Sequence, residues 1–189
     1  MKTRPGYIKL YESGQLRKKS ESLHKILESC QLCPRNCKVN RLKGELGFCR
    51  SGKDLIISSF APHFGEEPEL VGKFGSGTIF FTNCNLGCIY CQNYDISHLG
   101  QGSKSSSQDL AGEMIYLKNL GCHNINFVTP THFVPQIVEA IELACREGLD
   151  LPLVYNCGGY ENVEVIRLLD GIFDIERKPN KQTIKNWIW

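Results

Sequence analysis

From Thr78 onward the chain alternates between short strand-like segments and longer helix-like segments. β-branched and aromatic residues mark the strands, and apolar residues at helical spacing mark the helices. The expected strands are 78–82, 125–128, 151–155 and 172–175, and the expected helices are 108–120, 135–147 and 162–169. Strands that are connected through helices run parallel within one sheet. The pattern therefore predicts an α/β fold of about four parallel strands, either a parallel sheet or an incomplete (β/α) barrel.

The first 77 residues do not follow this alternation. Residues 15–29 carry apolar side chains at helical spacing, which predicts a short amphipathic helix. Residues 55–60 form an apolar run that is typical of a strand, and residues 61–77 are rich in Gly and Pro and predict a loop. A second loop is expected at 100–107, where a serine would cap the next helix.

Charge is unevenly distributed along the chain. Residues 1–53 hold 13 Lys and Arg against 4 Asp and Glu, whereas residues 54–189 hold 9 against 16. We therefore divide the chain into a basic N-terminal segment (1–53), a β/α core (54–175) and a basic tail (176–189). The basic residues near the first cysteines form a solvated face or a docking patch for an acidic electron donor or a protein substrate. They are Arg35, Lys38, Arg41, Lys43 and Arg50. Few aromatic residues accompany them, so nucleic acid is not expected as a partner.

The sequence shows no recognisable export signal or membrane-spanning segment. No apolar run approaches the roughly 20 residues that span a bilayer, and the N-terminus lacks the apolar core of a secretion signal. We expect a cytoplasmic protein with no membrane partner. Thiols stay reduced in that compartment, so clustered cysteines indicate metal binding more often than disulfides.

Three of the ten cysteines form a C-x3-C-x2-C motif directly after the strand at 78–82. They are Cys84, Cys88 and Cys91. Three thiolates in one loop can ligate three corners of a [4Fe–4S] cluster and leave the fourth iron open. An open coordination position is typical of catalytic metals, and active sites of β/α folds gather at the carboxyl ends of the strands. The alternative, three buried thiols that act as small hydrophobic side chains, accounts less well for the spacing.

The residues around this motif resemble the radical S-adenosylmethionine (SAM) enzymes. Residues 75–97, GSGTIFFTNCNLGCIYCQNYDIS, are similar to the branch of pyruvate formate-lyase activating enzyme-like proteins. Residues 63–72, HFGEEPELVG, and residues 30–49, CQLCPRNCKVNRLKGELGFC, are similar to the same branch. The resemblance covers about residues 30–175.

This resemblance implies that Cys84, Cys88 and Cys91 each hold one iron and that SAM chelates the fourth. Tyr90 would lie against the adenine. One-electron reduction by a donor of the flavodoxin or ferredoxin type would cleave SAM to methionine and a 5′-deoxyadenosyl radical, which abstracts hydrogen from a substrate. The implied role is activation of a glycyl-radical enzyme, or radical modification of a peptide, an RNA or a small metabolite. The alternative is a non-catalytic iron–sulfur or zinc module for electron transfer or partner docking.

Other residues near the strand ends are expected to contact the cofactor or to serve the fold. Residues 129–132 stand where relatives have a glycine-rich motif that holds the amino group of SAM. Thr131 could accept a hydrogen bond from that group, whereas His132 is expected to pack or cap. Asn156 and the pair Gly158-Gly159 would reach the ribose or carboxylate, or form a tight turn. A loop that would approach the cluster, or form a solvated acidic surface, contains His63, Glu66 and Glu67.

The remaining cysteines divide into an N-terminal group and three single residues. The N-terminal group consists of Cys30, Cys33, Cys37 and Cys49, and the single residues are Cys122, Cys145 and Cys157. The spacing of the four is typical of a closed four-thiolate metal site. Zinc and a second iron–sulfur cluster both stay open, although the spacing fits iron–sulfur ligation slightly better than paired zinc knuckles. The single cysteines are expected to be core or near-core thiols.

The chain ends soon after the last expected strand. Related enzymes have six strands, but only 14 residues follow Ile175, and one further β-α-β unit needs about 30. We therefore expect strands five and six to be absent and the fourth strand to be an open edge. The tail is interpreted as the product of a truncation or frameshift, or as a segment that docks a partner through Trp187, Ile188 and Trp189. Such a chain is expected to hold its cluster but to bind SAM weakly and to turn over slowly, if at all, and an inactive truncated fragment is a further alternative.

Overall fold

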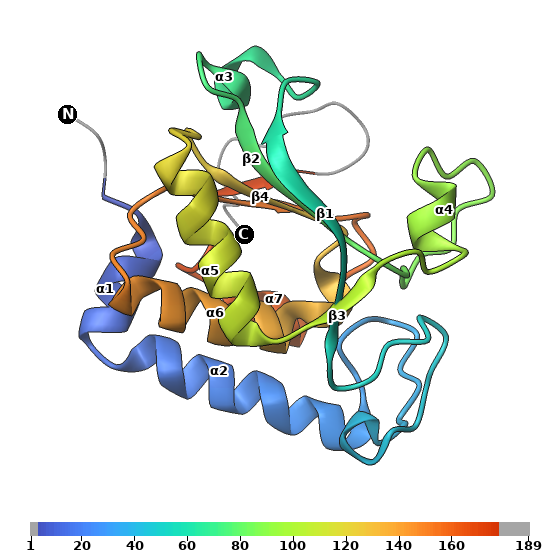
Figure 1. Cartoon of the computed structure of the whole chain (residues 1–189). Coiled ribbons are helices and arrows are strands. Elements are labelled where there is room, and N and C mark those ends of the chain that lie inside the picture. Colours follow the sequence, from blue (N-terminus) through green and yellow to red (C-terminus); the bar gives the residue numbers. More distant parts are fainter. Residues whose placement is uncertain (1–3, 178–189) are drawn as a thin grey trace.

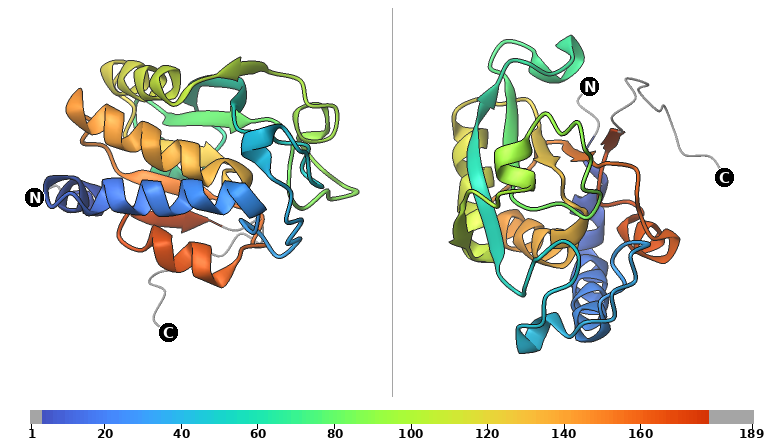
Figure 2. Two further views of the ribbon diagram at one scale, coloured as in Figure 1. Left: turned by 90° about the horizontal axis from the view of Figure 1, so that it is seen from below. Right: turned by 90° about the vertical axis from the view of Figure 1, so that its right-hand side faces the viewer.

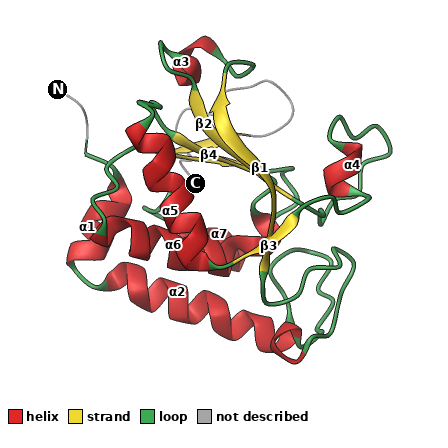
Figure 3. Ribbon diagram, viewed as in Figure 1, coloured by secondary structure: helices red, strands yellow, loops and turns green. Residues whose placement is uncertain are grey.

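The computed structural model describes residues 4–177, which contain one mixed six-stranded sheet (Figures 1 and 3). The strand order is β3-β1-β2-β4-β5-β6. Strands β2, β4, β5 and β6 pair in parallel, whereas β1 is antiparallel to both β2 and β3. The strands are β1 Leu55–His63, β2 Ser76–Phe81, β3 Ser103–Ser105, β4 Ile125–Val128, β5 Leu153–Asn156 and β6 Ile175–Arg177.

The four parallel strands are those that the alternation predicted, which confirms an α/β fold. β4 spans the predicted residues, and β2 and β5 lie within two residues of their predicted bounds. The prediction of a strand at 172–175 was wrong by about three residues, because Ile172 is buried in the core and the chain joins the sheet only after Asp174. The described strands form an open sheet with β3 and β6 at its edges, so the partial barrel stays a prediction.

A layer of helices covers one face of the sheet. Helix α6 lies between α5 and α2 in this layer, and α7 lies beside α2 (Figure 2). The helices are α1 Gly6–Glu12, α2 Gln15–Lys25, α3 Pro68–Val71, α4 Tyr94–Ser97, α5 Ser107–Asn119, α6 Val134–Arg146 and α7 Val163–Leu169. Within residues 4–177, none of them is long and apolar enough to cross a membrane.

Every second side chain of the central strands points into one core beneath the helices. These side chains are Ile79, Phe81, Ile125, Phe127, Leu153 and Tyr155, each at most 1% exposed. Phe81 stacks on Phe127 with ring centroids 6.3 Å apart and contacts Phe133, next to the start of α6, at 5.8 Å. Because the strands are parallel and packed in register, their carboxyl ends lie side by side. We call this side of the sheet its carboxyl edge, as distinct from the edge strands β3 and β6.

The predicted cap of α5 is confirmed. Ser106 Oγ accepts a hydrogen bond from the Asp109 N–H at 3.1 Å, and the Asp109 carboxylate accepts one from the Ser106 N–H at 2.9 Å. This capping box satisfies two of the backbone N–H groups that the first turn leaves without a helical partner.

The predicted N-terminal helix is confirmed as α2 with a 3₁₀ turn at Ile26–Ser29, and a further helix, α1, precedes it. Leu16 and Leu23 are fully buried in the same hydrophobic cluster as the sheet. Tyr7 of α1 donates from its hydroxyl to the Leu151 carbonyl at 2.9 Å. The N-terminal helices therefore share their core with the β/α elements, and the division at residue 53 stays a prediction.

Two segments that were expected to be loops contain regular structure. β1 continues to His63 because Ala61 and His63 pair with Thr78 and Ser76 of β2, and Pro68 opens α3. β3 lies inside the second expected loop and pairs with β1 at the exposed edge of the sheet, so it lacks the apolar pattern of a buried strand. The tail beyond residue 177, with Trp187, Ile188 and Trp189, lies outside the described residues.

Replacing Leu16 tests whether α2 belongs to the common core. We expect Leu16→Ala to lower the free energy of unfolding by about 2–5 kcal/mol, because it removes a buried side chain and leaves a cavity. Lys18→Ala on the exposed face of the same helix is the control and should change it by less than about 0.5 kcal/mol. Equal effects of the two variants in denaturant unfolding would contradict the common core.

Candidate functional site

The C-x3-C-x2-C motif lies in the loop between β2 and α4, at the carboxyl edge of the parallel strands (Figure 1). Asn83 opens the loop with a left-handed backbone conformation (φ 63°), and Gly87 repeats it in the middle (φ 70°). These two residues turn the chain away from the sheet. The prediction that the three cysteines follow the first parallel strand in one loop is thus confirmed at the level of the backbone.

The three thiols differ in their exposure to solvent. Cys88 is exposed, whereas Cys84 and Cys91 are partly buried. The Leu86 N–H donates to Cys84 Sγ at 3.3 Å, and Cys91 Sγ lies 3.0 Å from Ser97 Oγ of α4. Burial raises the pKa of Cys84; the amides of Gly87 and Leu86 lower it, and the nearby charges of Cys88 and Cys91 raise it further. The thiols are therefore close enough to influence one another's ionisation.

This donor set fits a cluster with one open position. Three thiolates occur on one loop, and loop N–H groups already point at one sulfur, as they do around protein-bound iron–sulfur clusters. Within residues 4–177, however, no three His, Cys, Asp or Glu side chains stand ready in ligand positions.

The tip of the loop presents two large apolar side chains to solvent. Tyr90 is 97% exposed and Ile89 is 86% exposed. They are the two most exposed large apolar side chains among the described residues. Their position between Cys88 and Cys91 agrees with the expected contact between Tyr90 and a planar ring, which stays a prediction.

The loop is held by hydrogen bonds from three directions. Asn83 donates from its N–H to the Ile96 carbonyl at 2.8 Å, and Asn85 Nδ2 donates to the Tyr160 carbonyl at 2.9 Å. Arg35, from the N-terminal segment, donates to the carbonyls of Asn85 at 3.1 Å and Leu86 at 3.0 Å. Segments that are 50 residues or more apart in the sequence therefore determine where the cysteine loop lies.

A second polar cluster lies at the ends of β4 and β5. The Glu161 carboxylate accepts hydrogen bonds from Thr131 Oγ1 at 2.6 Å and from the Tyr155 hydroxyl at 3.0 Å. Burial raises the pKa of Glu161, whereas these hydrogen bonds lower it. The hydroxyl hydrogen of Thr131 is thus directed at Glu161. Glu161 was not singled out from the sequence, because its partners come from two separate segments.

The other residues near the strand ends serve the fold. His132 is buried, lies 2.8 Å from the Thr82 carbonyl through Nε2 and contacts the Phe133 ring, so its predicted packing role is confirmed. Asn156 ends β5 and is partly buried. Gly159 has a left-handed backbone conformation (φ 75°), as a tight turn requires. Contacts of Asn156, Gly158 and Gly159 with a cofactor stay a prediction.

Of the two expectations for the loop with His63, Glu66 and Glu67, the approach to the cluster was wrong. His63 pairs with Ser76 at the beginning of β2, so the connection through α3 lies at the amino end of that strand, opposite the cysteine loop (Figure 1). There Asn126 Nδ2 donates to the Glu66 carboxylate at 3.1 Å. An antiparallel hairpin between β1 and β2 places its turn at the wrong edge for a contact with Cys84.

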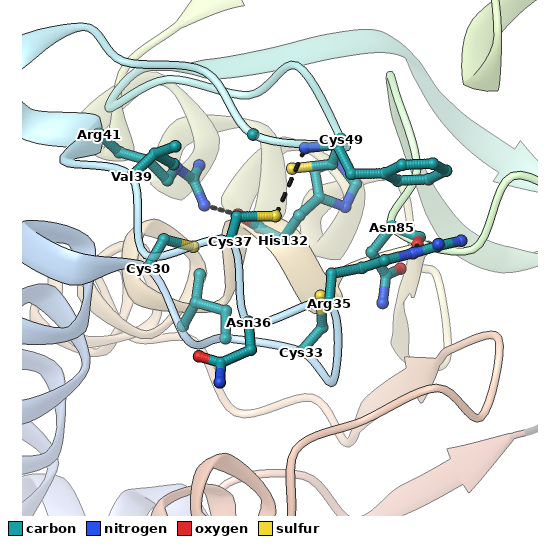
Figure 4. Close-up of a pocket in the computed structure, with 13 residues that line it drawn as sticks. Cys30, Cys33, Arg35, Asn36, Cys37, Val39, Arg41, Cys49, Asn85 and His132 are labelled. Atoms are coloured by element: carbon teal, nitrogen blue, oxygen red, sulfur yellow. Dashed lines mark hydrogen bonds between the residues drawn. The ribbon is translucent and has the colours of Figure 1, made fainter.

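The four N-terminal cysteines surround one small cavity (Figure 4). The cavity has a volume of about 10 Å³ and is also lined by Arg41, Asn85 and His132. The Phe48 N–H donates to Cys37 Sγ at 3.5 Å. Burial raises the pKa of Cys33, and hydrogen bonds from the Arg35 amide and the Asn85 side chain lower it. The structure thus brings all four predicted residues to one cavity, but within residues 4–177 no three of them stand in positions ready to hold a metal ion.

The basic residues of this segment divide into two kinds. Four are at least partly exposed, namely Arg35, Lys38, Lys43 and Arg50, and agree with a basic surface. The expectation that Arg41 belongs to this surface was wrong, because Arg41 is only 1% exposed. Its side chain is turned inward by hydrogen bonds to the carbonyls of Gly52 and His132.

The single cysteines behave as core or near-core thiols. Cys122 and Cys157 are buried and Cys145 is partly buried. Burial and the nearby charge of Glu142 raise the pKa of Cys145 to about 12. Burial and, next in importance, the charge of Glu161 raise the pKa of Cys157 to about 12 as well. Such thiols carry almost no thiolate at neutral pH and are poor nucleophiles.

Comparison with known proteins defines the class. The Radical SAM superfamily matches residues 78–174, and the chain therefore belongs to the radical SAM superfamily. Membership implies a [4Fe–4S] cluster and SAM as cofactors. The chain is also 32% identical over 170 residues to an uncharacterized protein of Methanocaldococcus jannaschii. This alignment covers 83% of the chain but only 46% of that protein, so the chain spans less than half of its relative's length. No solved structure matches the chain.

Alkylation tests the contrast between exposed and buried thiols. At pH 8 a thiol with a pKa of about 12, such as Cys157, is roughly one part in 10,000 thiolate. Cys88 is exposed, whereas Cys157 is also buried. In metal-free native protein, iodoacetamide should therefore label Cys88 at least about a hundredfold faster than Cys157. Reconstitution with iron and sulfide should then protect Cys88. Mass spectrometry measures both sites, and denatured protein is the control in which both label. Equal labelling in the native chain would contradict this assignment.

Proposed function

We propose that this chain cleaves SAM reductively at an iron–sulfur cluster held by Cys84, Cys88 and Cys91 and uses the resulting radical to modify a partner. The position of the cysteine loop carries the proposal: it stands at the carboxyl edge of four parallel strands, with Cys88 and Tyr90 open to solvent. The cluster and SAM, bound there, would supply the radical chemistry, and the residues of the chain would hold and orient them.

The residues of the chain position the cofactor and its surroundings. Tyr90 is placed to pack on the adenine ring, because its whole side chain is free at the loop tip. The hydrogen bonds of Asn83 and Asn85 fix the loop backbone so that the thiols stay at the strand ends. Electrons have to reach the loop from outside, and the exposed residues Arg35 and Arg50 beside it suit an acidic donor of the flavodoxin or ferredoxin type.

The more specific form of the proposal is an activase that places a glycyl radical on a partner enzyme. It is supported by the similarity of residues 30–49 and 75–97 to proteins of the pyruvate formate-lyase activating enzyme-like branch. A protein substrate also agrees with a loop that projects from the sheet. Modification of a peptide, an RNA or a small metabolite and a non-catalytic electron-transfer module are the other outcomes of the test. A second metal at the four N-terminal cysteines, zinc or iron–sulfur, belongs to the same proposal.

Electron paramagnetic resonance on the anaerobically reconstituted chain tests the function. Addition of SAM to the reduced protein should change the cluster spectrum, because SAM binds the open iron. Cys84→Ala, Cys88→Ala and Cys91→Ala should each lose this spectrum, and Cys145→Ala is the matched control that keeps it. Reductant-dependent formation of 5′-deoxyadenosine is the second measurement. A cluster whose spectrum ignores SAM would identify an electron carrier and overturn the proposal.

A further inference from the structure

The cavity between the four N-terminal cysteines contains a buried positive charge. The Arg41 guanidinium is 1% exposed and donates to the neutral carbonyls of Gly52 at 3.0 Å and His132 at 2.7 Å. Among residues 4–177, none of its recorded hydrogen bonds or ion pairs reaches a carboxylate. Buried charges in proteins are normally compensated by an opposite charge. The groups beside Arg41 that can become negative are the thiols of the same cavity.

A second polar group that lines the cavity, the imidazole of His132, has a nitrogen without a hydrogen-bond partner among the described residues. His132 is 2% exposed, and its Nε2 lies 2.8 Å from the Thr82 carbonyl, which can only accept a hydrogen bond. The ring proton therefore sits on Nε2, and Nδ1 is left as an acceptor. Nδ1 has no hydrogen-bond partner among the described residues, although His132 lines the cavity.

A metal ion held by these thiols satisfies the requirement for negative charge beside Arg41. Four cysteine thiols that bind a divalent ion release four protons and form a tetrathiolate with a net charge of −2, half of which Arg41 offsets. The volume of about 10 Å³ is roughly that of a single water-sized sphere, whereas a cube of four irons and four sulfides needs several times this space. Gly47 adds to the crowding, because a Cβ there would lie 2.9 Å from Cys37 Sγ.

The residues next to these cysteines hold the loop that carries Cys84, Cys88 and Cys91. Arg35, between Cys33 and Cys37, donates to the Asn85 and Leu86 carbonyls and stacks its guanidinium 3.6 Å from the centre of the Phe48 ring. Arg50, directly after Cys49, donates to the carbonyl of His98, the residue that follows α4 on the far side of the loop. The side chain of Phe48 also packs against Gly87. The N-terminal segment thus contacts the loop at both ends and in the middle.

We propose that Cys30, Cys33, Cys37 and Cys49 hold one zinc ion and that this closed site fixes Arg35 and Arg50 against residues 83–98. The inference rests on the second metal site proposed above. It specifies that the metal is zinc and that the role of the site is structural. The N-terminal metal is structural, and it positions the loop that binds the iron–sulfur cluster. The one regular element of segment 30–50 is the 3₁₀ turn Arg41–Lys43, and only Cys30 and Leu32 join the hydrophobic core, so metal ligation supplies the further order that so short a segment cannot build by packing alone.

Metal analysis and hydrogen exchange on the iron-free full chain test both parts without SAM or turnover. The wild-type chain should contain about one zinc, and Cys30→Ser/Cys33→Ser should contain less than about a tenth of that. In the double variant, amides of residues 83–98 should exchange several-fold faster, while those of α5 stay protected and show that the core is folded. Cys145→Ser is the matched control and should keep both zinc and protection.

Replacing Arg35 separates ligation from positioning. Arg35→Met should keep the zinc but lose protection in residues 83–98, because the two hydrogen bonds to the loop are gone. Lys43→Met, in the same segment and also exposed, should change neither. Unchanged zinc in the double cysteine variant would overturn the site. So would about eight irons per chain and no zinc after reconstitution, because four of those irons belong to the cluster at Cys84, Cys88 and Cys91. Unchanged exchange in zinc-depleted protein would overturn the positioning role. Failure of the SAM response described above alters none of these measurements.

Discussion

The contact between the central strands and the helix layer is the interaction on which the rest of the molecule depends. Phe81, Phe127 and Tyr155 project from three adjacent parallel strands into the core beneath α5 and α6. A shift of any strand by one residue would turn these rings to the other face of the sheet and expose them. Their burial therefore fixes the register, and the register brings the carboxyl ends of β2, β4 and β5 together. The cysteine loop, Glu161 and the turn at Gly159 all depend on that alignment.

The N-terminal segment completes the site without joining the sheet. Its cysteines and basic residues lie next to the loop after β2, and Arg41 reaches through the segment to the carbonyl of His132 (Figure 4). Each of these contacts joins residues that are at least 48 positions apart. A loop with three thiols and two exposed apolar side chains has little core of its own, so packing from outside has to hold it.

Local patterns allowed much of this to be predicted from the sequence. The strand at 125–128, the Ser106 cap and the place of Cys84 after a strand depend on neighbouring residues, and the structure confirms each of them. The burial of Arg41 and the partners of Glu161 depend on segments that meet only in the folded chain. The edge strand β3 carries no apolar pattern because both its faces are largely exposed. The features that could not be predicted are thus those that long-range packing determines.

The beginning of the chain is joined to its far end. The Gly6 N–H donates to the Asp174 carboxylate at 3.0 Å, Tyr7 bonds to Leu151, and Lys19 Nζ donates to the Leu168 carbonyl at 2.9 Å. During synthesis from the N-terminus, α1 and α2 are therefore made long before their partners exist. The hydrophobic face of α2, which packs chiefly against α6 (Val134–Arg146), therefore stays uncovered until roughly 120 further residues have been translated. Whatever keeps that nascent segment from aggregating or oxidising acts before the sheet has formed.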